Sequence, residues 1–305
     1  MTDTLRRRPR ALALALAFSG LAAVAGPGPS AWAQAPVEAG VGMAADGAIK
    51  IWNGGGSVRI EGWARDSLAV TGEVDGTAGG RFFLRAEGDV AKLGVEGDQA
   101  AVSGRLVVRL PAGATVWVRT TGADVTVRGL TGAVDIHTVS GDVDVESRPA
   151  TCYAESMAGD LTLRLEAGIV RARAGTGRIG FTGTATDLGL STVSGALTVS
   201  APVLRRGRFT TVDGALDFTG DVRTGGALVF ETHSGDIGIR LPRDVAADLR
   251  LSTFGGALRI GWDGAPAPDA GPGRRAIQLE LGDGGAEVEA RSYSGDVVVT
   301  PRDER

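Results

Sequence analysis

Cysteine, histidine and aromatic residues are scarce in this chain, and their scarcity narrows the classes of protein it can be. Cys152 is the only cysteine among 305 residues, so no disulfide can form within the chain. His137 and His233 are the only histidines, and aromatic residues make up 5% of the sequence. Glycine is abundant instead, with 48 residues, and this composition favours turns and strands over helices.

Long apolar runs are also missing beyond Ala25. The run at residues 11–25 is shorter than the ~20 residues that a membrane-spanning helix needs. It follows a basic segment and precedes small residues, so residues 1–33 resemble a secretory signal peptide. The arginines at 6–8 also suggest a twin-arginine signal, although Pro9 and Arg10 interrupt that pattern. We therefore expect an exported protein, periplasmic or at the cell surface.

An excess of positive charge is missing as well. Removing residues 1–33 takes away four arginines and one aspartate, which changes the formal net charge from −4 to −7. A mildly acidic exported protein is a poor match for nucleic acid or for an anionic membrane surface, so neither is an expected partner. We expect residues 34–45 to be a flexible linker and residues 46–300 to form one domain.

The most informative feature present is a motif that returns every 18 to 21 residues, in forms such as TVSGDVDV (138–145) and THSGDIGI (232–239). Repetition at this period is typical of a solenoid, in which each repeat is one rung of a stack. The last gap between the central glycines, from Gly256 to Gly295, is close to two periods. The central glycines, position zero of each repeat, are Gly141, Gly159, Gly177, Gly195, Gly214, Gly235, Gly256 and Gly295.

Apolar residues alternate with polar or small ones on both sides of each central glycine. Positions +2 and +4 are apolar in every repeat, as at Val143 and Val145, and positions −7 and −5 are nearly always so. This period of two indicates strands with one buried face, joined by a tight turn at the glycine. Cys152 falls at −7 and is expected to be a small buried hydrophobe. The sequence thus predicts an all-β fold, a single β-solenoid of about ten to twelve rungs.

Position −3 holds Thr or Ser in most repeats, and we expect a buried ladder in which these hydroxyls bond one another along the stack. The ends are less regular. Residues 46–100 contain strand-like runs without a clean period, so we expect an atypical N-terminal cap. A Gly/Pro loop at 261–275 is inserted between the last two rungs. Because strand ladders leave open ends, this cap and the charged tail 301–305 are expected to block association and keep the protein monomeric.

Several motifs resemble those of the bacterial putative-adhesin family, a group of exported repeat proteins that is often classed as a domain of unknown function. They are the repeats TVSGDVDV and THSGDIGIRLP, the opening NGGGSVRIEGW (53–63) and the two RLP corners (109–111 and 240–242). The resemblance covers roughly residues 46–300. It implies a right-handed β-helix and carries no catalytic residues over to this chain.

Position +1 holds Asp124, Asp142 and Asp160 on three consecutive repeats. If the rungs are in register, these carboxylates lie about 5 Å apart and repel one another unless they are solvated or bridged. A weak Ca²⁺ site is therefore one hypothesis, because calcium prefers oxygen ligands. The alternative is that each Asp accepts backbone N–H bonds in its own turn and faces water. No other cofactor or metal is expected.

Position −2 should face outward, yet it is mostly apolar, and exposed apolar stripes can mark a partner surface. The alternative is that the turn tucks these side chains beneath a neighbouring corner, or that the 261–275 loop covers them. The candidate partner-binding stripe consists of Val193, Val212, His233, Phe254 and Tyr293, with Val139, Met157 and Gly175 before it.

A polysaccharide-cleaving enzyme is the main alternative to a binding protein. Many β-helices cleave acidic polysaccharides with Asp clusters and a basic residue, and Arg171 and Arg173 lie near Asp160 in the sequence. Rungs as short as these leave little spare chain for a cleft, however. The two histidines lie five rungs apart and cannot share a metal or a catalytic dyad. We therefore expect no catalytic residues.

The function expected from these observations is non-catalytic. The chain is predicted to be an exported binding, adhesion-like or scaffold module for an envelope glycan or protein. A structural or envelope-stress-associated role without a small ligand is the other alternative.

Overall fold

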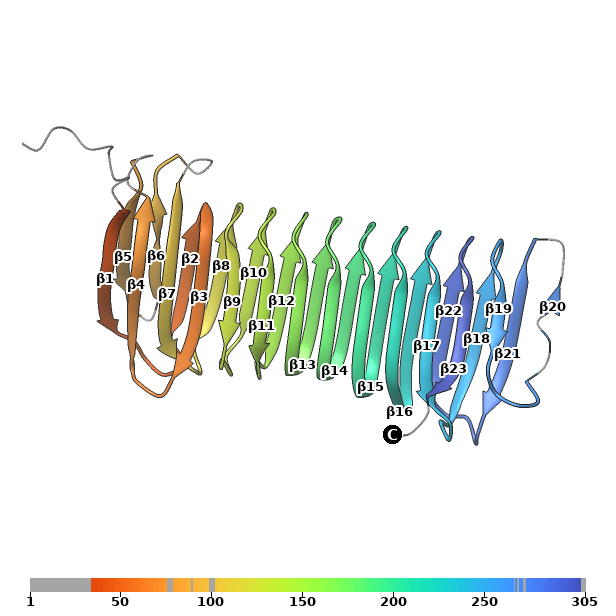
Figure 1. Cartoon of the computed structure of the whole chain (residues 1–305). Coiled ribbons are helices and arrows are strands. Elements are labelled where there is room, and N and C mark those ends of the chain that lie inside the picture. The colour runs from red at the N-terminus through yellow and green to blue at the C-terminus, as the bar shows by residue number, and fades with distance from the viewer. Residues whose placement is uncertain are drawn as a thin grey trace, which may run out of the picture. The chain divides into compact units, whose positions relative to one another are not determined.

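The computed structural model of the chain describes residues 34–75, 79–88, 90–98, 102–265, 267, 269–270 and 273–302. The predicted signal peptide and the last three residues of the tail lie outside the described residues. Within the described part there are strands and turns but no helix. Most strands lie parallel to their neighbours, one rung apart, which confirms the predicted all-β solenoid (Figure 1).

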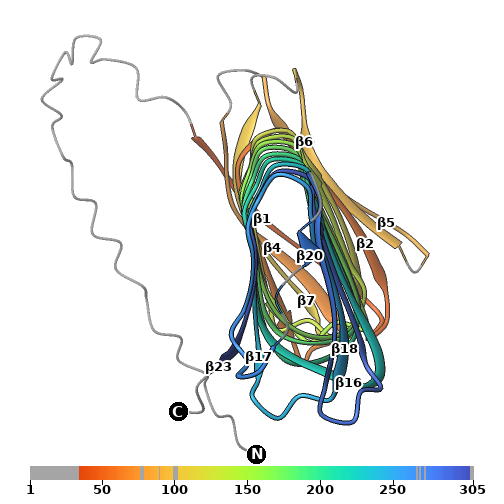
Figure 2. The ribbon, with the colours of Figure 1, turned by 90° about the vertical axis from the view of Figure 1, so that its right-hand side faces the viewer.

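Each rung has two faces and two edges. The strand before the central glycine lies on what we call face 1, and the strand after it lies on face 2. The tight turn at the glycine forms the turn edge, and a wider bend at the opposite side forms the bend edge. A view along the stack shows the resulting flattened tube (Figure 2). The register follows the repeat, so that Cys152 lies between Val134 and Val170 on face 1, while Leu161 lies between Val143 and Ile179 on face 2.

Hydrogen bonds between neighbouring strands define the order of the strands on each face. On face 1 it is β5 (Arg81–Glu87), β6 (Val90–Glu96), β2 (Ala48–Asn53), β8 (Thr115–Thr120), β10 (Val134–Thr138), β12 (Thr151–Ser156), β13 (Leu161–Ala174), β14 (Ile179–Thr192), β15 (Leu197–Thr211), β16 (Leu216–Thr232), β22 (Glu287–Ser292), β18 (Ala247–Thr253), β21 (Arg275–Leu281) and β20 (Asp269–Ala270). On face 2 it is β1 (Gln34–Gly42), β4 (Ser67–Asp75), β7 (Ser103–Pro111), β3 (Gly55–Trp63), β9 (Asp124–Arg128), β11 (Val143–Ser147), the first halves of β13 to β16, β17 (Ile237–Pro242), β23 (Val297–Arg302) and β19 (Leu258–Ile260).

The core is a set of aliphatic stacks, as the alternating pattern predicted, because the side chains at −7, −5, +2 and +4 point inward and are buried. Rings replace aliphatic side chains around β15 and β16, where Phe209, Phe218 and Phe230 pack with centroids 5.0 to 5.7 Å apart. Gly207 at −7 makes this possible, since a Cβ there would lie 2.7 Å from the Phe209 ring. The missing side chain of Gly207 thus leaves the space that the three rings fill.

The hydroxyl ladder at position −3 was predicted correctly in its burial but wrongly in its bonding. Each hydroxyl accepts the N–H of the central glycine three residues later, as in Gly141 N to Thr138 Oγ1 at 3.1 Å and Gly159 N to Ser156 Oγ at 2.8 Å. Several donate to a carbonyl of the adjacent rung, as Thr253 does to Gly295 O at 2.8 Å. The backbone of a tight turn offers unpaired groups closer than the next hydroxyl, so the ladder stabilises the turns.

The C-terminal rung does not lie at the end of the stack. β22 pairs with β16 on one side and β18 on the other, and β23 lies between β17 and β19. In Figure 1 the darkest blue strands, β22 and β23, lie between lighter blue ones. After β17 the chain therefore passes over the adjacent rung position, forms the β18/β19 rung beyond it, and returns to occupy that position with β22 and β23. The last repeat in the sequence is the second-last rung in space.

The N-terminal end uses the same arrangement. Residues 48–63 were predicted as part of an atypical cap, but β2 and β3 form a regular rung between β6/β7 and β8/β9. Gly56 is its position zero, because Ser57 pairs with Asp124 at +1. Asn53 occupies the −3 position, where it is buried, and its amide donates to the carbonyls of Gly55 and Gly104 at 2.8 Å. Only the rest of the N-terminal region acts as a cap.

Antiparallel strands lie at both ends of face 1 and at the N-terminal end of face 2, and two predictions about the ends are corrected. Residues 34–45 are not a flexible linker throughout, because Gln34–Gly42 forms β1 and pairs with β4. At the far end β21, paired antiparallel with β18, takes the capping position predicted for the tail. Pro301 and Arg302 end β23 inside the stack instead.

Candidate functional site

The apolar side chains at position −2 lie exposed along the turn edge. They form a row along successive rungs, interrupted at Gly175, and their exposed fractions range from 42% at Val212 to 66% at Met157. The turn holds them outward because the N–H groups of positions −2 and −1 bond to a carbonyl of the neighbouring rung, as Val212 and Asp213 do to Val193 O. The stripe is therefore a surface feature. In space its order is Val139, Met157, Gly175, Val193, Val212, His233, Tyr293 and Phe254.

The aromatic end of this stripe is a continuous stack. The Tyr293 ring lies 4.9 Å from His233 and 5.3 Å from Phe254, with planes within 5° of parallel. The inserted C-terminal rung creates this contact, since it places Tyr293 between two residues that precede it in the sequence. The sequence identified all three residues but missed their adjacency. Gly273 lies against the Phe254 ring, so the 261–275 loop touches the end of the stripe while Phe254 stays 48% exposed.

The aspartates at position +1 bond to the neighbouring rung. Asp124 Oδ1 accepts the N–H of Asp142 at 3.0 Å, and Asp142 Oδ1 accepts that of Asp160 at 2.8 Å. Asp160 in turn accepts the N–H of Arg178 at 2.8 Å, and its second oxygen lies 3.3 Å from the Arg178 guanidinium. Each carboxylate thus accepts its backbone hydrogen bond from the turn of the next rung, and not from its own turn as one of the two alternatives expected. Among the described residues no group of three acidic, His or Cys side chains is arranged to hold a metal ion, and the calcium site stays a hypothesis.

The residues considered for polysaccharide cleavage do not meet. Asp160 points outward from face 2, whereas Arg171 and Arg173 point outward from face 1. His137 lies on face 1 between two carboxylates, 2.9 Å from Asp135 and 3.2 Å from Glu155, and His233 lies on the turn edge. The arrangement imagined for an enzyme is therefore split between opposite faces.

Cys152 lies fully buried in the −7 stack, as the sequence predicted. Burial raises the pKa of its thiol to about 12, with a smaller contribution from the charge of Asp135. A thiol with that pKa is neutral at physiological pH, and the thiolate is the reactive form. Cys152 is thus a packing residue.

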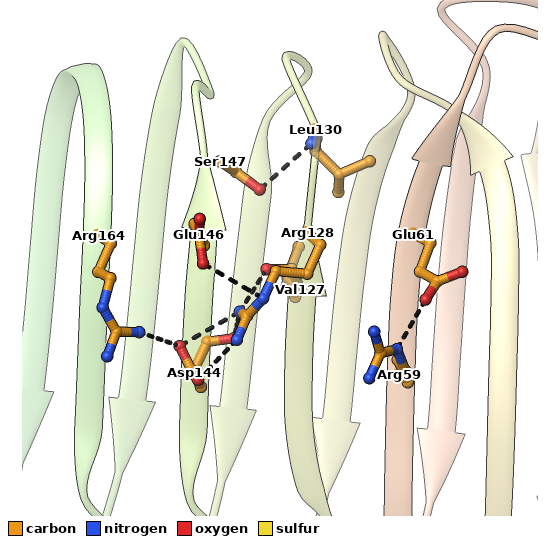
Figure 3. Close-up of polar contacts among 9 residues, drawn as sticks. All are labelled: Arg59, Glu61, Val127, Arg128, Leu130, Asp144, Glu146, Ser147 and Arg164. Atoms are coloured by element: carbon orange, nitrogen blue, oxygen red, sulfur yellow. Dashed lines mark hydrogen bonds and ion pairs between the residues drawn. The ribbon is translucent and has the colours of Figure 1, made fainter.

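Face 2 carries a network of ion pairs (Figure 3). Arg128 grips Asp144 with two bonds of 2.7 and 3.2 Å, and Arg164 binds the same carboxylate at 3.1 Å. Further along, Arg59 and then Arg109 hold the pKa of Glu61 below its ordinary value. Neighbouring rungs supply most of these partners, so the charges of this network are matched within the stack.

The comparisons with known proteins agree with this architecture. The model of the Toastrack DUF4097 family matches residues 105–300, which is more than half of the chain. The chain belongs to the Toastrack DUF4097 family. The predicted resemblance to a family of unknown function is thereby confirmed. None of the curated proteins compared with the Toastrack chain matches it.

Two solved structures extend the comparison. A putative adhesin from Parabacteroides merdae matches with a TM-score of 0.54 and 10% identity, over 88% of this chain and 96% of that one. A putative lipid binding protein from Parabacteroides distasonis matches with a TM-score of 0.52 and 9% identity, over 88% and 97%. At such identities the likeness shows the shared fold alone. Within the described residues no helix is long and apolar enough to cross a membrane.

Proposed function

We propose that this Toastrack chain is a non-catalytic, adhesin-type binding module of the cell envelope, and that it binds a protein partner through its turn edge. The exposed apolar stripe is the observation that carries the proposal. The core of the solenoid does not require apolar residues at −2, because these side chains lie outside it and about half of their surface meets water. An exposed apolar row of this kind is typical of interaction surfaces. The names of the two similar structures, an adhesin and a lipid binding protein, are consistent with a binding role.

The stacked rings favour a protein partner over a glycan at this edge. Sugars bind aromatic residues by lying on the ring face, but the faces of Tyr293 are covered by His233 and Phe254. The ring edges and the aliphatic side chains that remain exposed suit the apolar side chains of a protein. The arginine-rich leader, the acidic mature chain and the adhesin-type fold support a place in the envelope or at the cell surface.

A matched pair of tyrosine variants tests the proposal. Tyr293 on the turn edge and Tyr153 on face 1 are exposed to 54% and 43%. We expect Tyr293→Ser to weaken binding of the purified protein to envelopes of the producing cell at least about tenfold, as loss of a central apolar contact does. Tyr153→Ser should leave it within about twofold.

Protease treatment of the envelopes should abolish the difference in binding between the wild type and Tyr293→Ser, and glycosidase treatment should not. Equal binding by the two variants would place the contact away from the turn edge. A difference that survives protease treatment would reject a protein partner.

A further inference from the structure

A groove of about 420 Å³ lies on the outer side of face 1, across the second halves of β13 to β16. Its charged walls are Arg171 and Arg173 on one rung and Arg206 and Arg208 two rungs further on, with Asp187 and Gly189 on the rung between. The hydroxyls of Ser191 and Thr210 also line it.

The groove is shaped by Gly189. A Cβ there would lie 2.9 Å from Cδ of Arg171, so only glycine leaves room for that side chain to cross the middle rung. Arg171 is then held by three acceptors, namely Val170 O at 2.9 Å, Asp187 O at 3.2 Å and the Asp187 carboxylate at 3.0 Å. The guanidinium is thus fixed in place before any ligand arrives.

The charges of this groove are unbalanced, in contrast to those of the ion-pair network around Asp144 on face 2. Asp187 is the only acid in its lining, and its carboxylate is shared with Arg206, which lies 3.8 Å away. Arg208 binds Glu231 at the rim at 2.7 Å. Among the described residues Arg173 has no ion pair or side-chain hydrogen bond. Four arginines therefore face one aspartate in a chain whose formal net charge is −4.

We propose that this arginine groove binds a segment of an acidic polysaccharide. Arginine pairs well with carboxylate and sulfate groups, and such charge-assisted bonds are the strong ones. The two arginine pairs stand two rungs apart, about 10 Å at the usual strand spacing, so they can contact successive charged groups of one chain. Ser191 and Thr210 offer partners for the sugar hydroxyls between them.

The surroundings of the groove favour a narrow chain over a flat anionic membrane. Glu155 lies one rung before Arg173 on face 1, and Glu231 lies one rung after Thr210. A membrane plane would press its phosphates against both acids. A single polysaccharide chain laid across the strands, along the row of Arg171, Gly189 and Arg208, passes beside both acids, which lie two residues further along their strands. The site is separate from the turn edge and does not depend on the protein-binding role proposed above.

Calorimetry with the purified protein tests the site. The probes are polygalacturonate for carboxylates, dextran sulfate for sulfates, uncharged dextran as a blank and phosphatidylglycerol vesicles for a lipid surface. We expect at least one acidic polysaccharide to bind, and neither dextran nor vesicles to do so. The Arg173→Gln/Arg208→Gln variant should bind it at least about tenfold more weakly, since two charge-assisted contacts are lost. Far-UV circular dichroism confirms folding, and Arg173→Gln alone serves if the double variant fails to fold.

Two further variants separate the groove from general charge attraction. Gly189→Thr keeps every charge but fills the groove, and should weaken binding at least about fivefold. Arg178→Gln/Arg240→Gln removes the same charge from face 2 and should change affinity less than about twofold. An equal loss in this control, binding to vesicles alone, or no binding to either acidic polysaccharide would each overturn the proposal.

Discussion

The middle of this solenoid and its two ends are built from the same repeat in different orders. From β8 to β17 each rung follows its spatial neighbour along the chain, with a register shift of one repeat period. At the two ends the order differs. The β2/β3 rung lies inside the later β6/β7 strands, and the β22/β23 rung lies inside the earlier β18/β19 rung. The repeat therefore determines the shape of a rung, whereas the connecting segments determine its place in the stack.

The inserted order protects the last strands of the chain from fraying. A terminal strand usually has one neighbour and frays, but β22 and β23 have hydrogen-bonded neighbours on both sides. The arrangement requires contacts between residues 60 positions apart, as between Asp236 and Asp296. Pairings between residues distant in sequence slow folding, so we expect the β22/β23 rung to form slowly although it is well ordered once formed.

Deleting residues 287–305 should have the largest effect, because it removes an inner rung rather than an outer one. Val288, Val297 and Val299 are fully buried, and burial of each contributes on the order of 2 kcal/mol. We expect the free energy of unfolding to fall by more than about 5 kcal/mol, and β18, β19 and β21 to lose hydrogen-exchange protection. Strands β10 to β15 should keep theirs.

Removing residues 34–42 is the matched control for that deletion. Among the described strands β1 pairs only with β4, at the outer edge, so its loss should affect β4 and little else. If β18 kept its protection in the C-terminal deletion, the β18/β19 rung would have paired directly with the β16/β17 rung. Rungs stacked in the order of the sequence would then be as stable as the inserted order.

The regular rungs could be predicted from the sequence because each buried position repeats the same choice of residue. The N-terminal rung carries the same signal, with Ile49 and Ile51 before Gly56 and Val58 and Ile60 after it, although we did not predict it as a rung. The inserted order carries no such signal. The spacing between Gly256 and Gly295 is the same whether the last rung lies outside or inside its predecessor.

Gly214→Ala should have the next largest effect and act on the middle of the stack. A methyl group at Gly214 would overlap the carbonyl oxygen of Gly195 on the rung before, which is backbone and cannot rotate away. We expect a loss of at least about 3 kcal/mol in denaturant unfolding, typical of overpacking at a rigid position. Ala123, which stands at the same repeat position at the start of the series, provides the control. Ala123→Gly should cost less than about 1 kcal/mol, and equal losses would show that the glycine ladder is not a steric requirement.

The candidate surfaces were predicted less completely than the fold. The apolar stripe was found from position −2 alone, because one row of a periodic structure stays together whatever the order of the rungs. The stacking of Tyr293 between His233 and Phe254 needed the inserted order. The repeat also places Arg171, Gly189 and Arg208 at position −6 of three consecutive rungs, but the path of the Arg171 side chain over Gly189 to Asp187 needed the structure.

Asp296→Ala should have the smallest effect and reports on how the inserted rung is held. Its carboxylate accepts the N–H of Ala257 on the outer rung at 2.7 Å and binds Arg259 at 3.0 Å. The Ala257 N–H, followed by Arg259, holds the pKa of Asp296 below its ordinary value of 3.8. Because the folded-state pKa is lowered, this contribution is present above pH 3.8 and is lost as the pH falls below it.

We expect the free energy of unfolding of Asp296→Ala to fall by about 1 kcal/mol at pH 7, where one exposed hydrogen bond and one exposed ion pair are removed, and by almost nothing at pH 2. Asp296→Asn keeps the acceptor for Ala257 and should fall between the two proteins at pH 7. A difference between wild type and Asp296→Ala that is the same at both pH values would show that the side chain acts through packing and not through its charge.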